Sequence, residues 1–283
     1  MESSVAAALG ASVVGVATGS DSEIEETDTD YAPSVVGDLK RLSTTAFGAE
    51  VTGPYVFEDG SLLYSNQHPT TGTREALDGV ASPGQKANEP PYDRAGVGYF
   101  RGFNFELDGD NDDFEEVSIP DTPDKQSRVR SADHEFVVLA QGREPINGGS
   151  ERLGVAQTPD GTDISLDNFQ GTQYGGAATN PDCNQFVATN DAGTEGYLFT
   201  NWENSPGMVT RIPLSQNADG EWEADLENAM NLANTEPLRD LGGTRINCYG
   251  DLSPWNTMIS SEENYAHPRV SYTATVSDIV EKG

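Results

Sequence analysis

The side chains best suited to chemistry gather in one segment near the C-terminus, residues 242–264. This segment holds a thiol at Cys248, a rigid Pro254-Trp255 turn and the adjacent carboxylates Glu262 and Glu263. A thiolate is a soft ligand that can hold iron and a carboxylate is a hard oxygen ligand, so these groups together could bind metal. Neighbouring strand residues face opposite sides, so only one of the two glutamates need point at a metal. The competing interpretation is a buried free cysteine beside an acidic surface turn.

The run NCYGDLSPWNTMISSEEN, which begins at Asn247, resembles the signature of the PhoX family of bacterial and archaeal alkaline phosphatases, roughly NCxGGxTPWGTWxTCEE. The alignment has no gap and shares the cysteine, the first glycine, the Pro-Trp pair, a threonine and both glutamates. The sequence departs from the family pattern at Asp251, Asn256 and Ser261, which replace two glycines and a second cysteine. The spacing is specific, but it covers only this short segment.

A second segment, GYLFTNWEN from Gly196 to Asn204, is similar to a strand of the same family that ends in Asn-His-Glu. Trp202 stands in place of the histidine. The resemblance implies an all-β, six-bladed β-propeller that carries a cluster of iron and calcium. It assigns the metal ligands by position, and the residues concerned are Cys248, Glu263 and the adjacent Glu262, with Asn201 and Glu203 as further candidates.

The activity that the resemblance implies is hydrolysis of small phosphate esters by an exported phosphatase. Metals in such a site would polarise the phosphoryl oxygens and activate an oxygen nucleophile. Arg245 and Arg269 are the nearest cations that could hold phosphate, although a surface ion pair is the favoured role for each. Trp202 and Trp255 are expected to pack in the core.

Other motifs carry less chemistry. Asp108, Asp110 and Asp112 alternate like the first ligands of a calcium loop, but the twelfth position is Ile119 and the sixth is not glycine, which favours a solvated acidic turn. No GxSxG elbow and no GxxxxGK[ST] loop occur. With no CxxC and three scattered histidines, the sequence has no zinc-ligand spacing. The two cysteines could form one disulfide or remain separate thiols.

The elements that must position these groups are short strands separated by turn signals. Strand-type runs are predicted at 55–57, 62–64, 135–139, 185–188, 197–200 and 208–212. Asp-Gly pairs at 59–60, 160–161 and 219–220 predict tight reversals between strands. The best helix signal covers 225–232. Such a pattern is typical of an antiparallel all-β protein with few helices, either a sandwich or a propeller-like fold that is incomplete within this chain.

The charge balance indicates the solvent of the protein and excludes one class of partner. Forty-seven acidic residues against sixteen basic ones give a formal net charge of -31. Nucleic-acid grooves require clustered Lys and Arg, so nucleic acid is not an expected partner. At molar salt the Debye length falls to about 3 Å, which screens this self-repulsion. Only four lysines occur, and this composition resembles that of haloarchaeal proteins.

The chain divides into three parts. Residues 1–19 contain an uncharged Ala/Gly-rich run that suits the hydrophobic region of an export signal, with Met1 internal to a longer twin-arginine signal, or else a cytoplasmic helix. Residues 20–32 are an acidic tether. The β-propeller-like domain is expected over 33–283, without a membrane span.

Two functions follow as expectations. The first is an extracellular or surface-associated PhoX-like phosphomonoesterase. The chain ends twenty residues after Glu263, whereas the family draws further carboxylate ligands from downstream sequence, so we expect either the N-terminal part of a longer protein or a shortened relative. The second is a non-catalytic exported β-propeller module that binds calcium or a partner at the cell surface.

Overall fold

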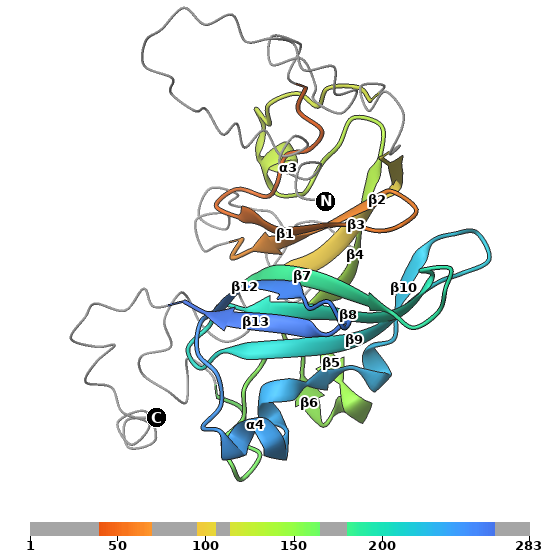
Figure 1. Cartoon of the computed structure of the whole chain (residues 1–283). Coiled ribbons are helices and arrows are strands. Elements are labelled where there is room, and N and C mark those ends of the chain that lie inside the picture. The colour runs from red at the N-terminus through yellow and green to blue at the C-terminus, as the bar shows by residue number, and fades with distance from the viewer. Residues whose placement is uncertain (1–39, 70–94, 106–113, 165–179, 264–283) are drawn as a thin grey trace, which may run out of the picture.

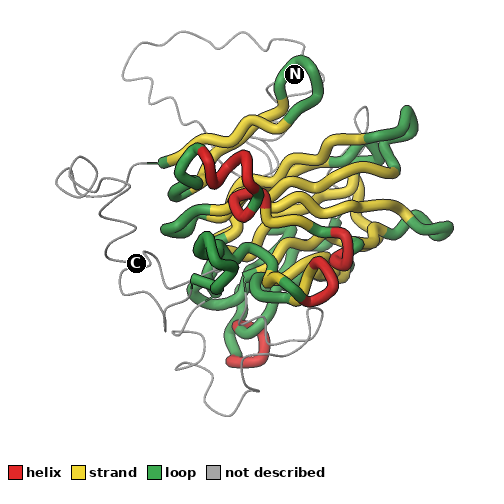
Figure 2. The backbone as a smooth tube through the Cα atoms, turned by 90° about the horizontal axis from the view of Figure 1, so that it is seen from below, coloured by secondary structure: helices red, strands yellow, loops and turns green. Residues whose placement is uncertain are grey.

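The computed structural model describes residues 40–69, 95–105, 114–164 and 180–263, and the fold below is that of these residues (Figure 1). Figure 2 shows that strands are the main regular structure of this backbone and that its helical turns are short. The strands are β1 (Glu50–Val56), β2 (Ser61–Gln67), β3 (Gly96–Asn104), β4 (Glu135–Gln141), β5 (Pro145–Ile146), β6 (Glu151–Arg152), β7 (Pro181–Ala188), β8 (Glu195–Trp202), β9 (Met208–Gln216), β10 (Trp222–Ala224), β11 (Met230–Asn231), β12 (Asn247–Leu252) and β13 (Met258–Glu262). The helical elements are α3 (Pro123–Gln126), α4 (Glu236–Asp240) and the 3-10 turns η1 (Asn147–Gly149), η2 (Leu226–Asn228) and η3 (Leu232–Asn234).

The first sheet joins four strands in the order β1-β2-β3-β4, all antiparallel. Its first hairpin turns at Asp59-Gly60, as the sequence predicts. The Asp59 carboxylate accepts a hydrogen bond from the backbone N–H of Ser61 at 2.9 Å, and Gly60 takes a φ of 85°, which glycine adopts without steric cost. Consecutive strands joined in this way form a simple meander.

Both faces of the first sheet are buried. Leu63, Val97 and Leu139 face the main hydrophobic core, whereas Leu62 and Tyr64 face a second cluster with Phe100 and Phe136. Successive strand residues point to opposite faces, so an unbroken apolar run such as Leu62-Leu63-Tyr64 suits a strand that is covered on both sides. This arrangement buries the middle of the first sheet on both faces, whereas edge-strand residues such as Val51 remain exposed.

The second sheet has the order β10-β9-β8-β7, with β11 paired to β9. Leu198, Ile212 and Leu214 from this sheet pack into the main core with residues of the first sheet, and Trp222 stacks on Phe57 with ring centroids 4.1 Å apart. Burial of such side chains contributes about 1.5–3 kcal/mol each. The apolar contacts between the two sheets therefore hold the fold together.

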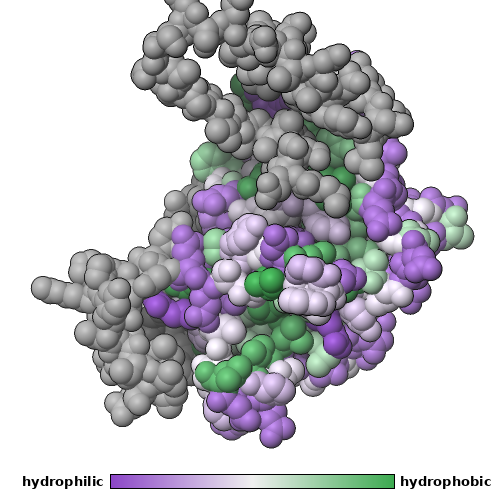
Figure 3. All heavy atoms as spheres, in the orientation of Figure 1, coloured by the Kyte–Doolittle hydropathy of each residue, from purple (hydrophilic) through white to green (hydrophobic). Residues whose placement is uncertain are grey.

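A third, two-stranded sheet is the hairpin of β12 and β13, which packs against β7 and β8 (Figure 1). Hydrophilic residues cover much of the described surface in this view, with apolar residues in smaller patches (Figure 3). The hairpin itself carries exposed Tyr249, Trp255 and Ile259. The prediction for Trp255 is therefore wrong, because it lies at the hairpin tip with 82% exposure, whereas Trp202 is fully buried as predicted.

The antiparallel all-β class is confirmed, while no closed barrel or propeller forms among the described residues. The prediction of a helix over 225–232 is wrong. Asp225 caps only one 3-10 turn by accepting from the N–H of Asn228, and Met230 and Asn231 then pair with β9. Asn side chains compete for backbone hydrogen bonds, which disfavours a continuous helix here. Within the described part, no helix is both long and apolar enough to cross a bilayer.

Candidate metal centre

The ends of strands from three of the four sheets meet at one place. Asp182 lies at the start of β7 and Glu203 directly follows β8, and these strands pair through Pro181 and Trp202. Cys248 lies in β12 and Glu263 directly follows β13, and these strands pair through Asn247 and Glu262. Because each antiparallel pair begins and ends at the same edge, the four side chains arrive together.

The geometry of this cluster suits a metal ion. One ligand atom from each of Asp182, Glu203 and Cys248 lies within 4.8 Å of the others, and all three residues are half-buried. The Cys248 thiol donates to Asp182 and to Glu263, and Glu263 is also hydrogen-bonded to Glu203. Within the described ranges, no lysine or arginine makes an ion pair with any of these four residues. The cluster is thus rich in acceptors, and no ion pair with another described residue offsets its negative charge.

Gln67, the last residue of β2, completes the surroundings of the cluster. It is fully buried and donates from Nε2 to the Glu203 carboxylate at 3.0 Å. The Glu203 backbone N–H is held by the carbonyl of Asn180 at 2.7 Å. Glu203 is thereby fixed at both its backbone and its carboxylate, which reduces its freedom to turn toward solvent.

Asp182 is positioned by a close approach between β1 and β7. Gly53 has a φ of 51°, and a Cβ there would collide with the backbone carbonyl of Asp182. The Asn184 amide donates to the carbonyl of Gly53 at 2.8 Å and to the hydroxyl of Ser65 at 2.7 Å. Only glycine permits this approach, so the first sheet determines where the Asp182 carboxylate lies.

Burial raises the pKa of three titratable groups in the cluster. It is the largest cause for Asp182, for Glu203, whose pKa rises to about 7, and for Cys248. The nearby carboxylates raise the pKa of Glu203 and Cys248 further, whereas the bond from Gln67 opposes the rise at Glu203. Without a cation, burial therefore works against the charged forms of these groups, and a metal ion would stabilise those charged forms.

Asn201, a candidate ligand from the sequence, has a different position. It is fully buried, and its Nδ2 donates to the backbone carbonyls of Cys248 and Tyr249 at 3.0 Å each. Its Oδ1 accepts from the hydroxyl of Ser260 at 2.9 Å. A Cβ at Gly250 would lie 3.2 Å from this amide and 2.6 Å from the carbonyl of Ile259, which explains the glycine. Asn201 joins β8 to the hairpin that carries Cys248.

Glu262 lies outside the cluster. Its Oε1 accepts a hydrogen bond from the backbone N–H of Arg245 at 2.9 Å, and the residue is exposed. Glu262 and Glu263 therefore point in different directions, as strand alternation requires. Arg269 and the acidic loop of Asp108, Asp110 and Asp112 lie outside the described residues.

Both cysteines are free thiols. Cys183 is buried and donates to the carbonyl of Gly250 at 3.2 Å, and burial raises its pKa to about 11. It is a neighbour of Asp182 in sequence but is not a member of the metal-binding group. Cys183 thus supports the hairpin from the core side.

Sequence reasoning missed Asp182 and Gln67. Asp182 stands in the run Asn180-Pro181-Asp182, which reads as an ordinary turn before a strand, and Gln67 ends the polar run Ser65-Asn66-Gln67. Neither position carries a motif of its own, because both join the cluster only through packing between sheets.

Comparison of the chain with protein-family models, curated proteins and solved structures gave no match.

Proposed function

We propose that the protein is a metal-dependent phosphomonoesterase related to the PhoX phosphatases. One observation carries the proposal. Cys248 and Glu263 from the first signature-like segment lie with Glu203 from the second in one half-buried cluster. Two segments that resemble the same family, and that are far apart in the sequence, thus supply side chains to one site.

The donor set fits a cluster of mixed metals. Cys248 offers one sulfur, and Asp182, Glu203 and Glu263 offer carboxylate oxygens. A thiolate prefers iron or zinc over calcium, whereas carboxylates suit calcium, so the proposed iron and calcium cofactors match the two ligand types. Bound there, the metals would supply Lewis-acid polarisation of a phosphoryl group and an activated oxygen nucleophile.

The residues of the chain then have separate tasks. Gln67 orients the Glu203 carboxylate and Asn201 orients the backbone of Cys248. Arg245, three residues before Cys248, is proposed to help hold the phosphate of a small ester, and Arg269 is a second candidate. A large polyanion such as nucleic acid, in contrast to a small ester, would be repelled by the net charge of -31.

The architecture supports a propeller-like assembly as part of this proposal. A propeller blade is a four-stranded antiparallel meander that packs between two neighbours. The first sheet is such a meander with both faces buried, and β7–β10 form a second. The β12–β13 hairpin is proposed to belong to a third blade.

The proposed location is outside the cell. The Ala/Gly-rich run of 1–19 and the acidic tether of 20–32 support export by the twin-arginine route and association with the cell surface. The acidic composition supports a function at high salt.

The test is metal analysis of the full chain purified at high salt, together with hydrolysis of p-nitrophenyl phosphate. We expect wild type to hold iron and calcium and to release phosphate. Cys248→Ala and Glu263→Gln should each lower bound metal and reduce hydrolysis at least a hundredfold. Cys183→Ala removes the other free thiol and should retain both properties.

The outcomes separate the two functions that the sequence suggests. Metal-free, inactive wild-type protein would overturn the phosphatase proposal. Wild-type protein that binds metal through Cys248 but hydrolyses no ester would instead support a non-catalytic exported module.

A further inference from the structure

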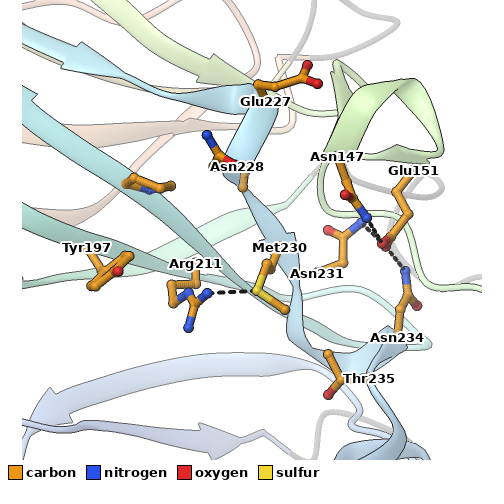
Figure 4. Close-up of a pocket in the computed structure, with 12 residues that line it drawn as sticks. Asn147, Glu151, Tyr197, Arg211, Glu227, Asn228, Met230, Asn231, Asn234 and Thr235 are labelled. Atoms are coloured by element: carbon orange, nitrogen blue, oxygen red, sulfur yellow. Dashed lines mark hydrogen bonds between the residues drawn. The ribbon is translucent and has the colours of Figure 1, made fainter.

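A polar pocket, distinct from the metal centre, is lined by residues of the second sheet and of the turns beside it (Figure 4). Its volume is about 490 Å³, within the range of about 300–1,000 Å³ typical of small-molecule sites. Strands β6, β8, β9 and β11 and the turns η1, η2 and η3 contribute to its lining, which includes none of the proposed metal ligands. A ligand bound in this pocket would therefore not depend on the proposed phosphatase function.

Arg211 gives the pocket its chemistry. It lies on β9 between Phe199 of β8 and Met230 of β11, and it is half-buried. Its guanidinium lies over the ring of Tyr197, 4.9 Å from the ring centroid. Such stacking occupies the flat face of the guanidinium and leaves the N–H donors along its edge available for in-plane hydrogen bonds.

The donors of Arg211 lack a strong acceptor. The Nη2 group donates to the thioether sulfur of Met230, which is a weak acceptor. The buried Nε has no hydrogen-bond partner. No carboxylate of the described part forms an ion pair with Arg211. This is notable in a chain that has 47 acidic residues to offer. The terminal Nη groups are thus the donors that a ligand would meet.

The two glutamates of the pocket do not neutralise this arginine. The Glu151 carboxylate accepts hydrogen bonds from the amides of Asn147, Asn231 and Asn234 at 2.7–3.4 Å. The side chain of Glu227 is exposed at the rim and extends away from Arg211 (Figure 4). The charge of Arg211 is consequently unmatched within the pocket.

We infer that this pocket binds a small oxyanion, a carboxylate or a tetrahedral phosphate or sulfate group, at the Nη edge of Arg211. The guanidinium edge matches two oxygens of such a group, and charge-assisted bonds of this type are stronger than bonds to a thioether. Tyr197 holds the guanidinium plane in place, which reduces the ordering required when the anion arrives. The surrounding negative charge limits the site to small anions.

The test is equilibrium dialysis of the full chain against radiolabelled sulfate in metal-free buffer of constant ionic strength, with EDTA present so that no metal centre can take up the anion. We expect one sulfate to bind per chain in the millimolar range or tighter. Unlabelled phosphate and acetate serve as competitors, and their relative strength distinguishes a tetrahedral from a planar ligand.

Arg211→Gln should weaken sulfate binding at least tenfold, whereas Arg152→Gln removes an exposed positive charge outside the pocket and should leave binding unchanged. Met230→Glu keeps the arginine but places a carboxylate beside it, and this variant should not bind sulfate. It provides a second test of the site in case Arg211→Gln does not fold. Sulfate that fails to bind to wild type, or that binds equally to wild type and Met230→Glu, would overturn the inference.

Discussion

At the scale of residues, the metal centre depends on acidic groups that are brought together while half-buried. Glu203 is surrounded by Asp182, Cys248 and Glu263. The neutral amide of Gln67 donates a hydrogen bond to the Glu203 carboxylate. Burial is the main reason that the pKa of Glu203 rises to about 7. The same proximity that would bind a cation therefore makes the metal-free site sensitive to pH.

We predict that metal-free protein loses stability between pH 4.5 and 7. A carboxyl whose pKa is raised by folding stabilises the folded state below its ordinary pKa, and this contribution disappears as pH rises through about 7. Because Glu203 is only half-buried, we expect about 1 kcal/mol. Urea unfolding at pH 5 and pH 8 in EDTA measures the change. Glu203→Gln should reduce it, and an equal change in both proteins would show that Glu203 does not titrate in this way.

At the scale of elements, the hairpin β12–β13 is held in place by Asn201. This one amide bonds two carbonyls of β12 and a hydroxyl of β13, so it fixes the strand that carries Cys248 relative to β8. Gly250 permits the contact because any side chain there would collide with β13. The position of the thiol is therefore a property of packing between two sheets.

Asn201→Ala should destabilise the protein by about 1–2 kcal/mol, because the part-buried carbonyls of Cys248 and Tyr249 lose their common donor. Hydrogen exchange should rise chiefly in β12 and β13. Asn228→Ala, at an exposed asparagine of η2, should change the free energy of unfolding by less than about 0.5 kcal/mol. Exchange that increases equally across the sheets in Asn201→Ala would contradict this local role.

At the scale of the whole molecule, the net charge of -31 sets the conditions for stability. The Debye length is about 10 Å at 0.1 M salt and about 3 Å at 1 M, so concentrated salt removes most repulsion between exposed carboxylates.

We expect the melting temperature to rise by more than about 10 °C between 0.1 M and 2 M potassium chloride, a shift equivalent to a few kcal/mol. Circular dichroism follows the transition. Sucrose stabilises proteins by exclusion from their surface without screening charge, so it serves as the control and should give a smaller rise. A melting temperature that does not depend on potassium chloride would contradict the screening argument.

The sequence by itself determined the features that depend on neighbouring residues. The apolar runs and Asp-Gly turns specify antiparallel strands, and Asp59-Gly60 forms the hairpin that its residue types require. Strand alternation already implied that Glu262 and Glu263 point in different directions. The charge balance likewise needs no structure, because it is a sum over residues.

Only the tertiary structure decided which side chains meet. Asp182 and Gln67 carry no motif, and they reach Glu203 because two sheets pack together and Gly53 allows their backbones to approach. The segment 225–232 lost its predicted helix to pairing with β9, and Asn201 was drawn into hydrogen bonds with the hairpin rather than into the cluster. Local sequence fixes turn chemistry and periodicity, whereas these outcomes depend on contacts between residues far apart in the chain, whose energies only the assembled core supplies.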